Sequence, residues 1–355
     1  MTESREKDRY QAILRKTWDQ QIPYRVLWEL TYRCNERCLH CYIVDRDGRG
    51  ELTTAEAHRV IDELAEAGTL FLTFTGGEAL LREDFFAIAG YARQRGFAIR
   101  LLTNGTLITP ELADQLKALR PLTVEISLYG VRPETHDAIT QLPGSHERSL
   151  RALHLLHERG VRVKIKSPLM ECTVPQFEEL RALADRLVGG FVYDTGLVPA
   201  NDGSDRPLAY AMRPETLERF YQRHLGDWEL IQPESDSRIC NAGIDTAAID
   251  PYGNVYPCVQ FRLKGGNLQE ESFQTIWHDS TVLRAIRAIT FSQLTDCQHC
   301  ELLAYCFRCP GVVYLESGNW LGCSQIARNH AATRRKVLNL RSKVAPQMTD
   351  GAVVR

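Results

Sequence analysis

Cysteine is the residue type in this sequence most able to bind metals or take part in redox chemistry. Its eleven copies are grouped rather than scattered. Three lie together at Cys34, Cys38 and Cys41, while Cys172 stands alone. In a reducing compartment structural disulfides are rare, so clustered thiols indicate metal or redox chemistry. The remaining seven form a C-terminal group: Cys240, Cys258, Cys297, Cys300, Cys306, Cys309 and Cys323.

The first group occupies one short loop just after a predicted strand. In parallel α/β folds, sites are built at the carboxyl ends of the strands. Three thiolates on such a loop can hold three corners of a [4Fe–4S] cluster, which leaves one iron open to a small chelating substrate. A closed structural site needs four ligands, and the alternative interpretation is therefore a zinc ion with His40 as the fourth ligand.

A second motif follows the next predicted strand directly. Gly76 and Gly77 there allow the backbone to approach a ligand closely, and Glu78 can accept a hydrogen bond from an ammonium group. An ordinary turn between a strand and a helix is the alternative interpretation. Both motifs would lie at the same edge of a parallel sheet.

The seven C-terminal thiols do not divide into whole four-cysteine zinc sites. They divide into one complete four-cysteine cluster and one three-cysteine cluster. A hairpin turn over residues 250–253 would bring Cys258 back beside Cys240. Two CXXC pairs also suit a zinc ribbon, which remains the alternative.

Short β-rich runs alternate with amphipathic helices through the middle of the chain. Thr53 and Glu56 form a capping box that predicts the start of a helix. Six such β/α units predict a parallel sheet, either open or closed into a barrel. The predicted strands are residues 25–30, 70–75, 99–102, 123–127, 163–166 and 191–193.

Composition excludes several classes of protein. With 44% apolar and 25% charged residues among 355, the chain has the mix of a globular protein. Lys plus Arg is 43 against 45 Asp plus Glu, so no broad basic field exists to bind nucleic acid. The apolar runs are too short to span a membrane, and no signal peptide is visible, which predicts a cytoplasmic protein. The basic residues near the C-terminus are predicted to lie on a solvated terminal helix.

The CX3CX2C spacing followed by Tyr42, together with the Gly-Gly-Glu sequence at 76–78, resembles the signature of the radical S-adenosylmethionine superfamily. This resemblance implies a partial (β/α)6 TIM-like barrel. It also implies a [4Fe–4S] cluster whose open iron chelates the methionine moiety of S-adenosylmethionine, giving a 5′-deoxyadenosyl radical that abstracts hydrogen from a substrate. The implied cofactor-binding residues are Tyr42, Gly76, Gly77, Glu78, Asn104 and Ser127.

The order of the C-terminal cysteines resembles the SPASM extension of peptide-modifying radical enzymes. The resemblance implies that Cys240, Cys258 and Cys309 hold a first auxiliary cluster with one open or external ligand. A second auxiliary cluster is then held by Cys297, Cys300, Cys306 and Cys323. The implied organisation is an N-terminal extension (1–22), a barrel (23–199), a linker (200–237), a SPASM domain (238–330) and a C-terminal tail (331–355).

From these resemblances we expect an enzyme that modifies a ribosomally synthesised peptide or protein. A separate leader-peptide recognition protein and a flavodoxin- or ferredoxin-like electron donor are the expected partners. The alternatives are a tetrapyrrole or other small-molecule substrate, a peptide epimerase in which Cys172 donates hydrogen, and a non-catalytic zinc or iron–sulfur redox protein. Asp194, at the end of the sixth predicted strand, is a candidate general base or substrate contact.

Overall fold

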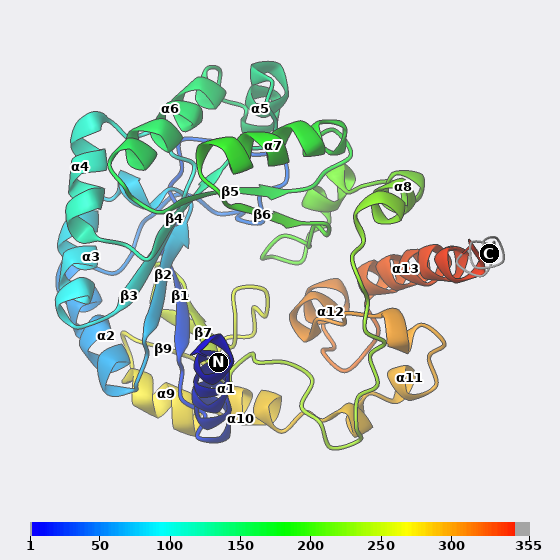
Figure 1. The fold of residues 1–355 in the computed structure, drawn as a ribbon. Coiled ribbons are helices and arrows are strands. Elements are labelled where there is room, and N and C mark those ends of the chain that lie inside the picture. Colours follow the sequence, from blue (N-terminus) through cyan, green and yellow to red (C-terminus); the bar gives the residue numbers. More distant parts are fainter. Residues whose placement is uncertain (1, 345–355) are drawn as a thin grey trace.

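Six parallel strands form the centre of the fold, and every strand predicted from the sequence is present. The computed structural model describes residues 2–344, and the side chains of residues 9–341. The strands are hydrogen-bonded in the order β6-β5-β4-β3-β2-β1 and curve into an open partial barrel (Figure 1). Their bounds are β1 (Arg25–Thr31), β2 (Phe71–Gly76), β3 (Ala98–Thr103), β4 (Thr123–Ser127), β5 (Val163–Pro168) and β6 (Phe191–Asp194).

Helices cover the convex face of this sheet and bury alternate residues of each strand (Figure 1). Leu72 and Phe74 of β2 are fully buried there, as are Ile99 and Leu101 of β3, because successive side chains of a strand point to opposite faces. The predicted capping box at Thr53 begins the first of these helices. They are α2 (Thr54–Glu66), α3 (Phe85–Gln94), α4 (Pro110–Leu119), α5 (Pro133–Thr140), α6 (Ser145–Glu158) and α7 (Phe177–Leu187).

The concave face of the strands lines the barrel interior and is polar. Glu125 of β4 is buried there between Arg100 of β3 and Lys166 of β5. Closed barrels fill this space with layers of branched aliphatic side chains. The charged lining of this barrel instead borders cavities, described below.

The cysteine-rich segment begins as a continuation of the barrel sheet. Strand β7 (Thr246–Ile249) pairs in parallel with the free edge of β1, and β8 (Asn254–Tyr256) and β9 (Gly266–Asn267) follow antiparallel. The predicted hairpin turn is present, with Asp250 accepting hydrogen bonds from the backbone N–H groups of Tyr252 and Asn254. The sheet therefore runs across the boundary predicted at residue 238.

The other helices pack beside this extension or on each other. They are α1 (Thr2–Asp19), α8 (Pro214–His224), α9 (Phe273–Asp279), α10 (Thr281–Arg287), α11 (Thr295–Gln298), α12 (Pro310–Ser317) and α13 (Gln325–Val344). Short 3-10 helices lie at Ala79–Leu81, Val174–Gln176, Arg206–Tyr210, Phe291–Gln293 and Leu303–Tyr305.

The predicted C-terminal helix is present, but one face of it is packed against the protein rather than solvated, while Lys336 and Arg341 on it are exposed. Helix α13 begins at Gln325, ahead of the predicted boundary, and packs against α8. Val337 is buried, and the guanidinium of Arg334 lies over the rings of Trp228 and Phe307. Two buried apolar residues, Ala331 and Val337, and the cation–π contacts of Arg334 anchor this helix. Residues 345–355 lie outside the described residues.

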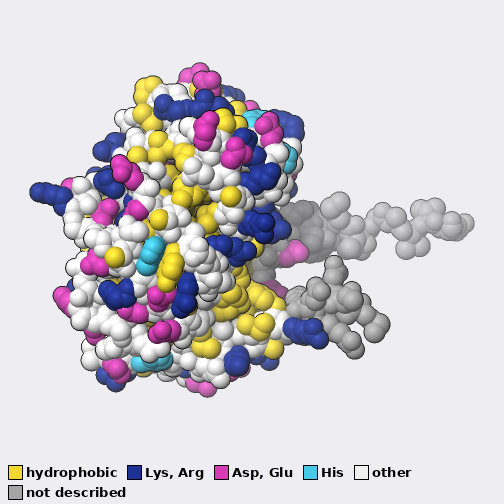
Figure 2. Space-filling view, turned by 90° about the vertical axis from the view of Figure 1, so that its left-hand side faces the viewer, with side chains coloured by type: hydrophobic (Ala, Val, Ile, Leu, Met, Phe, Trp, Pro, Cys, Tyr) yellow, Lys and Arg dark blue, Asp and Glu magenta, His cyan; other side chains and the backbone are white. Residues whose placement is uncertain are grey.

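The outer helical face carries charges of both signs. Figure 2 shows Lys and Arg side chains interspersed with Asp and Glu over this face, without a broad field of one sign. Among the described residues, no helix is both long and apolar enough to cross a lipid bilayer.

Candidate metal centre and cofactor cavity

The loop after β1 brings the three N-terminal thiols to the mouth of the barrel. Cys34, Cys38 and Cys41 all line one cavity of about 400 Å³. The backbone N–H of Arg37 donates to the carbonyl of Thr140 at 2.9 Å, which holds the loop against the end of α5. Burial raises the pKa of Cys34 to about 11. A thiolate at this position therefore requires a bound cation, because a coordinating thiol is deprotonated by its metal.

A buried carboxylate that sequence reasoning missed lies among these thiols. The Sγ of Cys38 donates to Glu36 Oε2 at 3.2 Å and lies 4.0 Å from the hydroxyl of Tyr129. Burial raises the pKa of Glu36 to about 7. Its Oε1 is buried without a hydrogen-bond partner among the described residues. A buried acceptor left without a donor beside three thiols fits a site that receives a positively charged group.

The two glycines are required by a close crossing of backbones. Gly76 has φ +123, and a Cβ on it would lie 2.3 Å from the carbonyl oxygen of Thr31. A Cβ on Gly77 would lie 2.2 Å from the carbonyl oxygen of Arg33. The end of β2 is thus fitted against the chain that enters the cysteine loop, and both glycines line the cavity.

Glu78 lies behind the cavity rather than on its surface. Its buried carboxylate accepts hydrogen bonds from the hydroxyl of Thr103 at 2.8 and 2.9 Å, from the N–H of Asn104 at 2.8 Å and from the N–H of Leu80 at 3.1 Å. These donors hold the turn after β3 in place. The predicted contact between Glu78 and an ammonium group stays a prediction, and Gly76 and Gly77 are the residues of this motif that border the cavity.

The other predicted cofactor-binding residues surround the same cavity. Asn104 and Ser127 line it at the carboxyl ends of β3 and β4. The Asn104 amide also donates to the side chain of Asn35 at 2.8 Å, which links this turn to the cysteine loop. Tyr42 lines the cavity too, while its hydroxyl donates to Glu29 at 2.5 Å. The structure thus brings Tyr42, Asn104 and Ser127 together with the three thiols.

The two candidate catalytic residues differ in position. Asp194 at the end of β6 lines the cofactor cavity and a neighbouring one. Cys172 is exposed and lies on the connection after β5, next to Glu171, which is paired with Arg213 at 2.6 Å. It lines neither the cofactor cavity nor the neighbouring cavity that Asp194 borders. This position gives no support to a hydrogen-donor role for Cys172.

A buried histidine beneath Tyr129 makes the stability of this region depend on pH. His136 Nδ1 accepts a hydrogen bond from the N–H of Tyr129 at 3.1 Å, and burial, followed by the nearby His146, lowers the pKa of His136 to about 3. The unfolded chain takes up this proton near its ordinary pKa, about 6.5. The stabilisation is therefore complete above that pH and is lost as the pH falls below it. For one such group, the free energy of unfolding falls by about 1.4 kcal/mol as the pH is lowered from about 7.5 to 5.5.

His136→Asn keeps an acceptor at the same position and removes the titration. We expect the urea midpoint of the wild-type protein to fall relative to that of His136→Asn as the pH is lowered over this range. Parallel pH profiles of the two proteins would show that His136 is not kept neutral by the fold.

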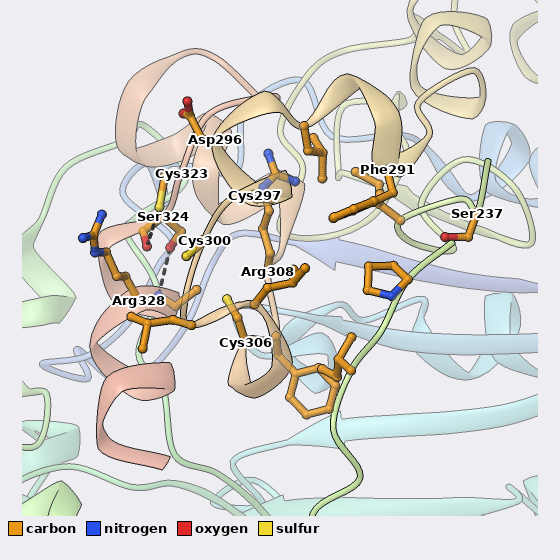
Figure 3. Close-up of a pocket in the computed structure, with 18 of the residues that line it drawn as sticks. Ser237, Phe291, Asp296, Cys297, Cys300, Cys306, Arg308, Cys323, Ser324 and Arg328 are labelled. Carbon is orange, nitrogen blue, oxygen red and sulfur yellow. Dashed lines mark hydrogen bonds between the residues drawn. The ribbon is translucent and has the colours of Figure 1, made fainter. Parts of the chain in front are cut away.

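The seven C-terminal thiols form two groups with the membership predicted from the sequence. Cys240 and Cys258 lie close to Cys309: burial, with the neighbouring Cys309 thiol adding to it, raises the pKa of Cys240 to about 11 and that of Cys258 to about 12. The other four line a separate cavity of about 340 Å³ (Figure 3): Cys297, Cys300, Cys306 and Cys323. Their role as iron ligands stays a prediction.

Arg308 is a half-buried cation between the two thiol groups. Its Nε and Nη2 donate to the carbonyl of Gly322 at 3.0 and 2.9 Å, while its Nη1 is buried without a hydrogen-bond partner among the described residues. Burial lowers the pKa of Arg308, and the thiols of Cys297 and Cys309 oppose this. An unpaired guanidinium N–H among thiols fits a site that becomes anionic when the thiols bind metal. Nothing in the sequence marked Arg308, because an arginine between cysteines resembles an ordinary surface residue.

The three-cysteine group reaches the cofactor cavity through Gln260. Cys309 Sγ donates to Gln260 Oε1 at 3.5 Å, and Gln260 lines both the cofactor cavity and the cavity that contains Cys309. Asp194 also borders both spaces. The two metal-binding regions are therefore adjacent across one or two side chains.

No three His, Cys, Asp or Glu side chains in the described part of the chain meet at a point suited to a single metal ion. A four-iron cluster binds each cysteine through a different iron, so its ligands surround a volume. The thiols here border cavities in that manner. The donor set and the partnerless Arg308 nitrogen together fit iron–sulfur clusters, while the partnerless Glu36 oxygen fits a cationic group beside the first of them.

Comparison with known proteins agrees with this geometry. The model of the Radical SAM superfamily matches residues 28–184, and that of an iron–sulfur cluster-binding domain, SPASM, matches residues 240–301. Mycofactocin maturase MftC of Mycobacterium tuberculosis is 33% identical over 293 residues, covering 75% of this chain and 73% of its own. AdoMet-dependent heme synthase of Methanosarcina barkeri is 29% identical over 330 residues, covering 84% of this chain and 94% of its own.

Among solved structures, Streptococcus suis SuiB bound to precursor peptide SuiA has a TM-score of 0.65 at 15% identity, with 91% of this chain and 80% of SuiB covered. The structure of anSMEcpe with bound AdoMet and the Cp18Cys peptide has a TM-score of 0.68 at 15% identity, with 90% and 99% covered. At these identities the likeness concerns the fold. The sequence matches and the arrangement of thiols together establish that this chain belongs to the radical SAM superfamily and carries a SPASM domain.

Proposed function

We propose that this protein uses S-adenosylmethionine and a [4Fe–4S] cluster to modify a ribosomally synthesised peptide or protein. The observation that carries the proposal is the single cavity bordered by Cys34, Cys38 and Cys41 and by the glycines of the second motif. When bound, the cluster and S-adenosylmethionine supply a 5′-deoxyadenosyl radical that abstracts hydrogen. The cavity opens toward the barrel interior, where a substrate can approach.

The residues around this cavity have separable tasks. The three thiols would hold the cluster, while Gly76, Gly77, Asn104 and Ser127 would hold S-adenosylmethionine. The partnerless Glu36 oxygen adds negative charge beside a cationic cofactor. Apolar residues along the rim, Ile43, Leu102, Leu197 and Val198, would exclude water from the reacting atoms.

The C-terminal thiols would hold two auxiliary clusters, one with Cys240, Cys258 and Cys309 and one with the other four. The contact between Cys309 and Gln260, which lines the cofactor cavity, supports a role for this group in exchanging an electron with a substrate or in binding it. The alternative is a purely structural role, since metal binding supplies folding energy to segments with few apolar contacts. A flavodoxin- or ferredoxin-like donor and a separate leader-peptide recognition protein complete the proposed system.

Two substrate classes follow from the relatives. Mycofactocin maturase, at 33% identity, favours a peptide substrate. AdoMet-dependent heme synthase matches a larger share of the chain, 84%, and makes a tetrapyrrole the second candidate.

Anaerobic incubation of the iron-loaded protein with S-adenosylmethionine and a reductant tests the proposal. We expect 5′-deoxyadenosine, with faster formation when the correct substrate is added. Peptides encoded beside the gene and Fe-coproporphyrin III are the two substrates to compare by mass spectrometry. Absence of 5′-deoxyadenosine would refute the radical reaction, and consumption of the porphyrin alone would replace the peptide by the tetrapyrrole.

A further inference from the structure

The lower half of the barrel interior contains a second cavity, of about 550 Å³. It lies at the amino ends of the strands, where Arg25, Thr73 and Thr123 line it. Leu27 and Val259 border both this cavity and the cofactor cavity above it. Cys258, a predicted ligand of the first auxiliary cluster, lines the lower cavity as well. The two cavities are therefore neighbouring parts of one lumen.

This lower cavity has a surplus of positive charge. Arg25 faces Asp245 at 3.7 Å, and Arg100 contacts Glu125. Glu125 is shared with Lys166 of the upper cavity at 3.9 Å, so it is already paired twice. The basic side chains that line the lower cavity are Arg25, Arg100, Arg162 and Lys164.

Arg162 and Lys164 have no ion pair among the described residues. Arg162 directly precedes β5, and Lys164 lies on the inward-facing side of that strand. The two residues are two positions apart, so their side chains point to the same face of the sheet. The stem of Lys164 packs on Gly190, where a Cβ would lie 2.9 Å from Lys164 Cγ. Lys164 is half-buried and Arg162 is exposed. An anion in the cavity beside them is attracted by both cations.

We propose that Arg162 and Lys164 bind a carboxylate of the substrate at the floor of the lumen. This inference rests on the proposed function and names a chemical group that its substrate must carry. A carboxylate accepts charge-assisted hydrogen bonds from Lys and Arg, and a fork of Arg donors can bind both of its oxygens. The C-terminus of a peptide and the propionate of a tetrapyrrole both supply this group.

The depth of the lumen fixes where the substrate reacts. On β4, Thr123 lines the floor and Ser127 lines the cofactor cavity. Those positions are about 13 Å apart, from a rise of about 3.3 Å per residue. A peptide held by its C-terminal carboxylate would be modified within about four residues of that end. A tetrapyrrole held by one propionate would react on the far side of the macrocycle.

Binding measurements with paired probes test the site. The probes are coproporphyrin III and its tetramethyl ester, and the C-terminal segment of a precursor peptide encoded beside the gene, with a free carboxylate or an amide. The test variant is Arg162→Gln/Lys164→Met, which leaves no buried carboxylate without its partner. The matched control is Lys117→Met/Arg151→Gln, which removes the same charge from exposed positions on α4 and α6.

In the wild-type and control proteins, we expect one of the two acid probes to bind about tenfold or more tightly than its ester or amide. In the test variant, this preference is lost while iron content and circular dichroism stay unchanged. The pair of probes in which the free acid binds more tightly identifies whether the carboxylate belongs to a porphyrin or to a peptide. A preference that persists in the test variant, or is absent from the wild-type protein in both arms, overturns the site. A wild-type preference without 5′-deoxyadenosine formation would refute the radical reaction and leave the carboxylate site standing.

Discussion

Replacing Cys34, Cys38 and Cys41 together by alanine is expected to abolish 5′-deoxyadenosine formation while the C-terminal clusters remain bound. The three thiols line the cofactor cavity, whereas none of the seven C-terminal thiols does. Iron content should therefore fall from about twelve to about eight per chain, since each of three cubane clusters holds about four irons. Iron analysis, together with chromatography of the nucleoside products, provides the measurement.

Two matched variants make this result specific. Cys172→Ala removes an exposed thiol outside the cavities and should leave iron content and 5′-deoxyadenosine formation unchanged. Cys240→Ala/Cys258→Ala/Cys309→Ala should lose about four irons as well, yet retain cleavage of S-adenosylmethionine in the absence of substrate. Formation of 5′-deoxyadenosine by the N-terminal triple variant would show that the assignment of the open cluster to this loop is wrong. Stoichiometric zinc in the wild-type protein would show the same.

The barrel was predictable from the sequence because its signals are local. Alternation of apolar residues on strands such as 123–127 and the capping box at Thr53 each depend on neighbours in the chain, and both appear in the structure. The division of the seven C-terminal thiols into four and three followed from their number, whereas the membership of each group came from the resemblance to the SPASM extension. The structure brings the same thiols together. Local sequence signals therefore predicted the fold, and the resemblance predicted the outline of the metal centres.

The buried charges were not predictable from the same signals. Glu36 and Arg308 lie between cysteines in the sequence, where a charged residue ordinarily faces solvent, and only the folded chain shows that each has a buried atom without a partner. The lumen cations lie on short strands whose inward face cannot be distinguished from a solvated face before the barrel is formed. Helix α1 was missed because its segment is charged throughout.

The contact that joins the two metal-binding regions is also invisible in the sequence, because its partners are more than 230 residues apart. Arg262 donates to both oxygens of Glu29, at 2.8 and 2.9 Å, and the side chains are 6% and 0% exposed. Burial opposes the charge on Arg262, yet its pairing with Glu29 raises its pKa above the ordinary value. Tyr32 and Tyr42 also donate to Glu29, at 3.0 and 2.5 Å.

This network ties the N-terminal cysteine loop to the first auxiliary cysteines. Tyr42 follows Cys41 directly, and Arg262 lies four residues after Cys258. The guanidinium of Arg262 also lies over the ring of Tyr42, 5.6 Å from its centre. The buried ion pair between Glu29 of β1 and Arg262 therefore joins the loop that carries Cys41 to the segment that follows Cys258.

Arg262→Met should destabilise the protein by about 3–5 kcal/mol, because it leaves the Glu29 carboxylate buried without its cation. The double variant Glu29→Gln/Arg262→Met should recover part of that loss, since it removes the uncompensated charge while the amide can still pair with the hydroxyls of Tyr32 and Tyr42. Arg95→Met is the matched control: its partner Asp62 lies 2.8 Å away, but the two side chains are 43% and 38% exposed. Removing that exposed pair should cost less than about 1 kcal/mol.

Urea unfolding of the anaerobic, iron-loaded proteins provides the measurement, with iron content recorded before each titration. Equal losses for Arg262→Met and Arg95→Met would show that Glu29 and Arg262 are not a stabilising pair. A double variant no more stable than Arg262→Met would assign the loss to the packing of the Arg262 side chain on Tyr42 and Tyr256 rather than to its charge. Recovery of stability without recovery of 5′-deoxyadenosine formation would show that the pair positions the cysteine loop for the reaction as well as holding the fold together.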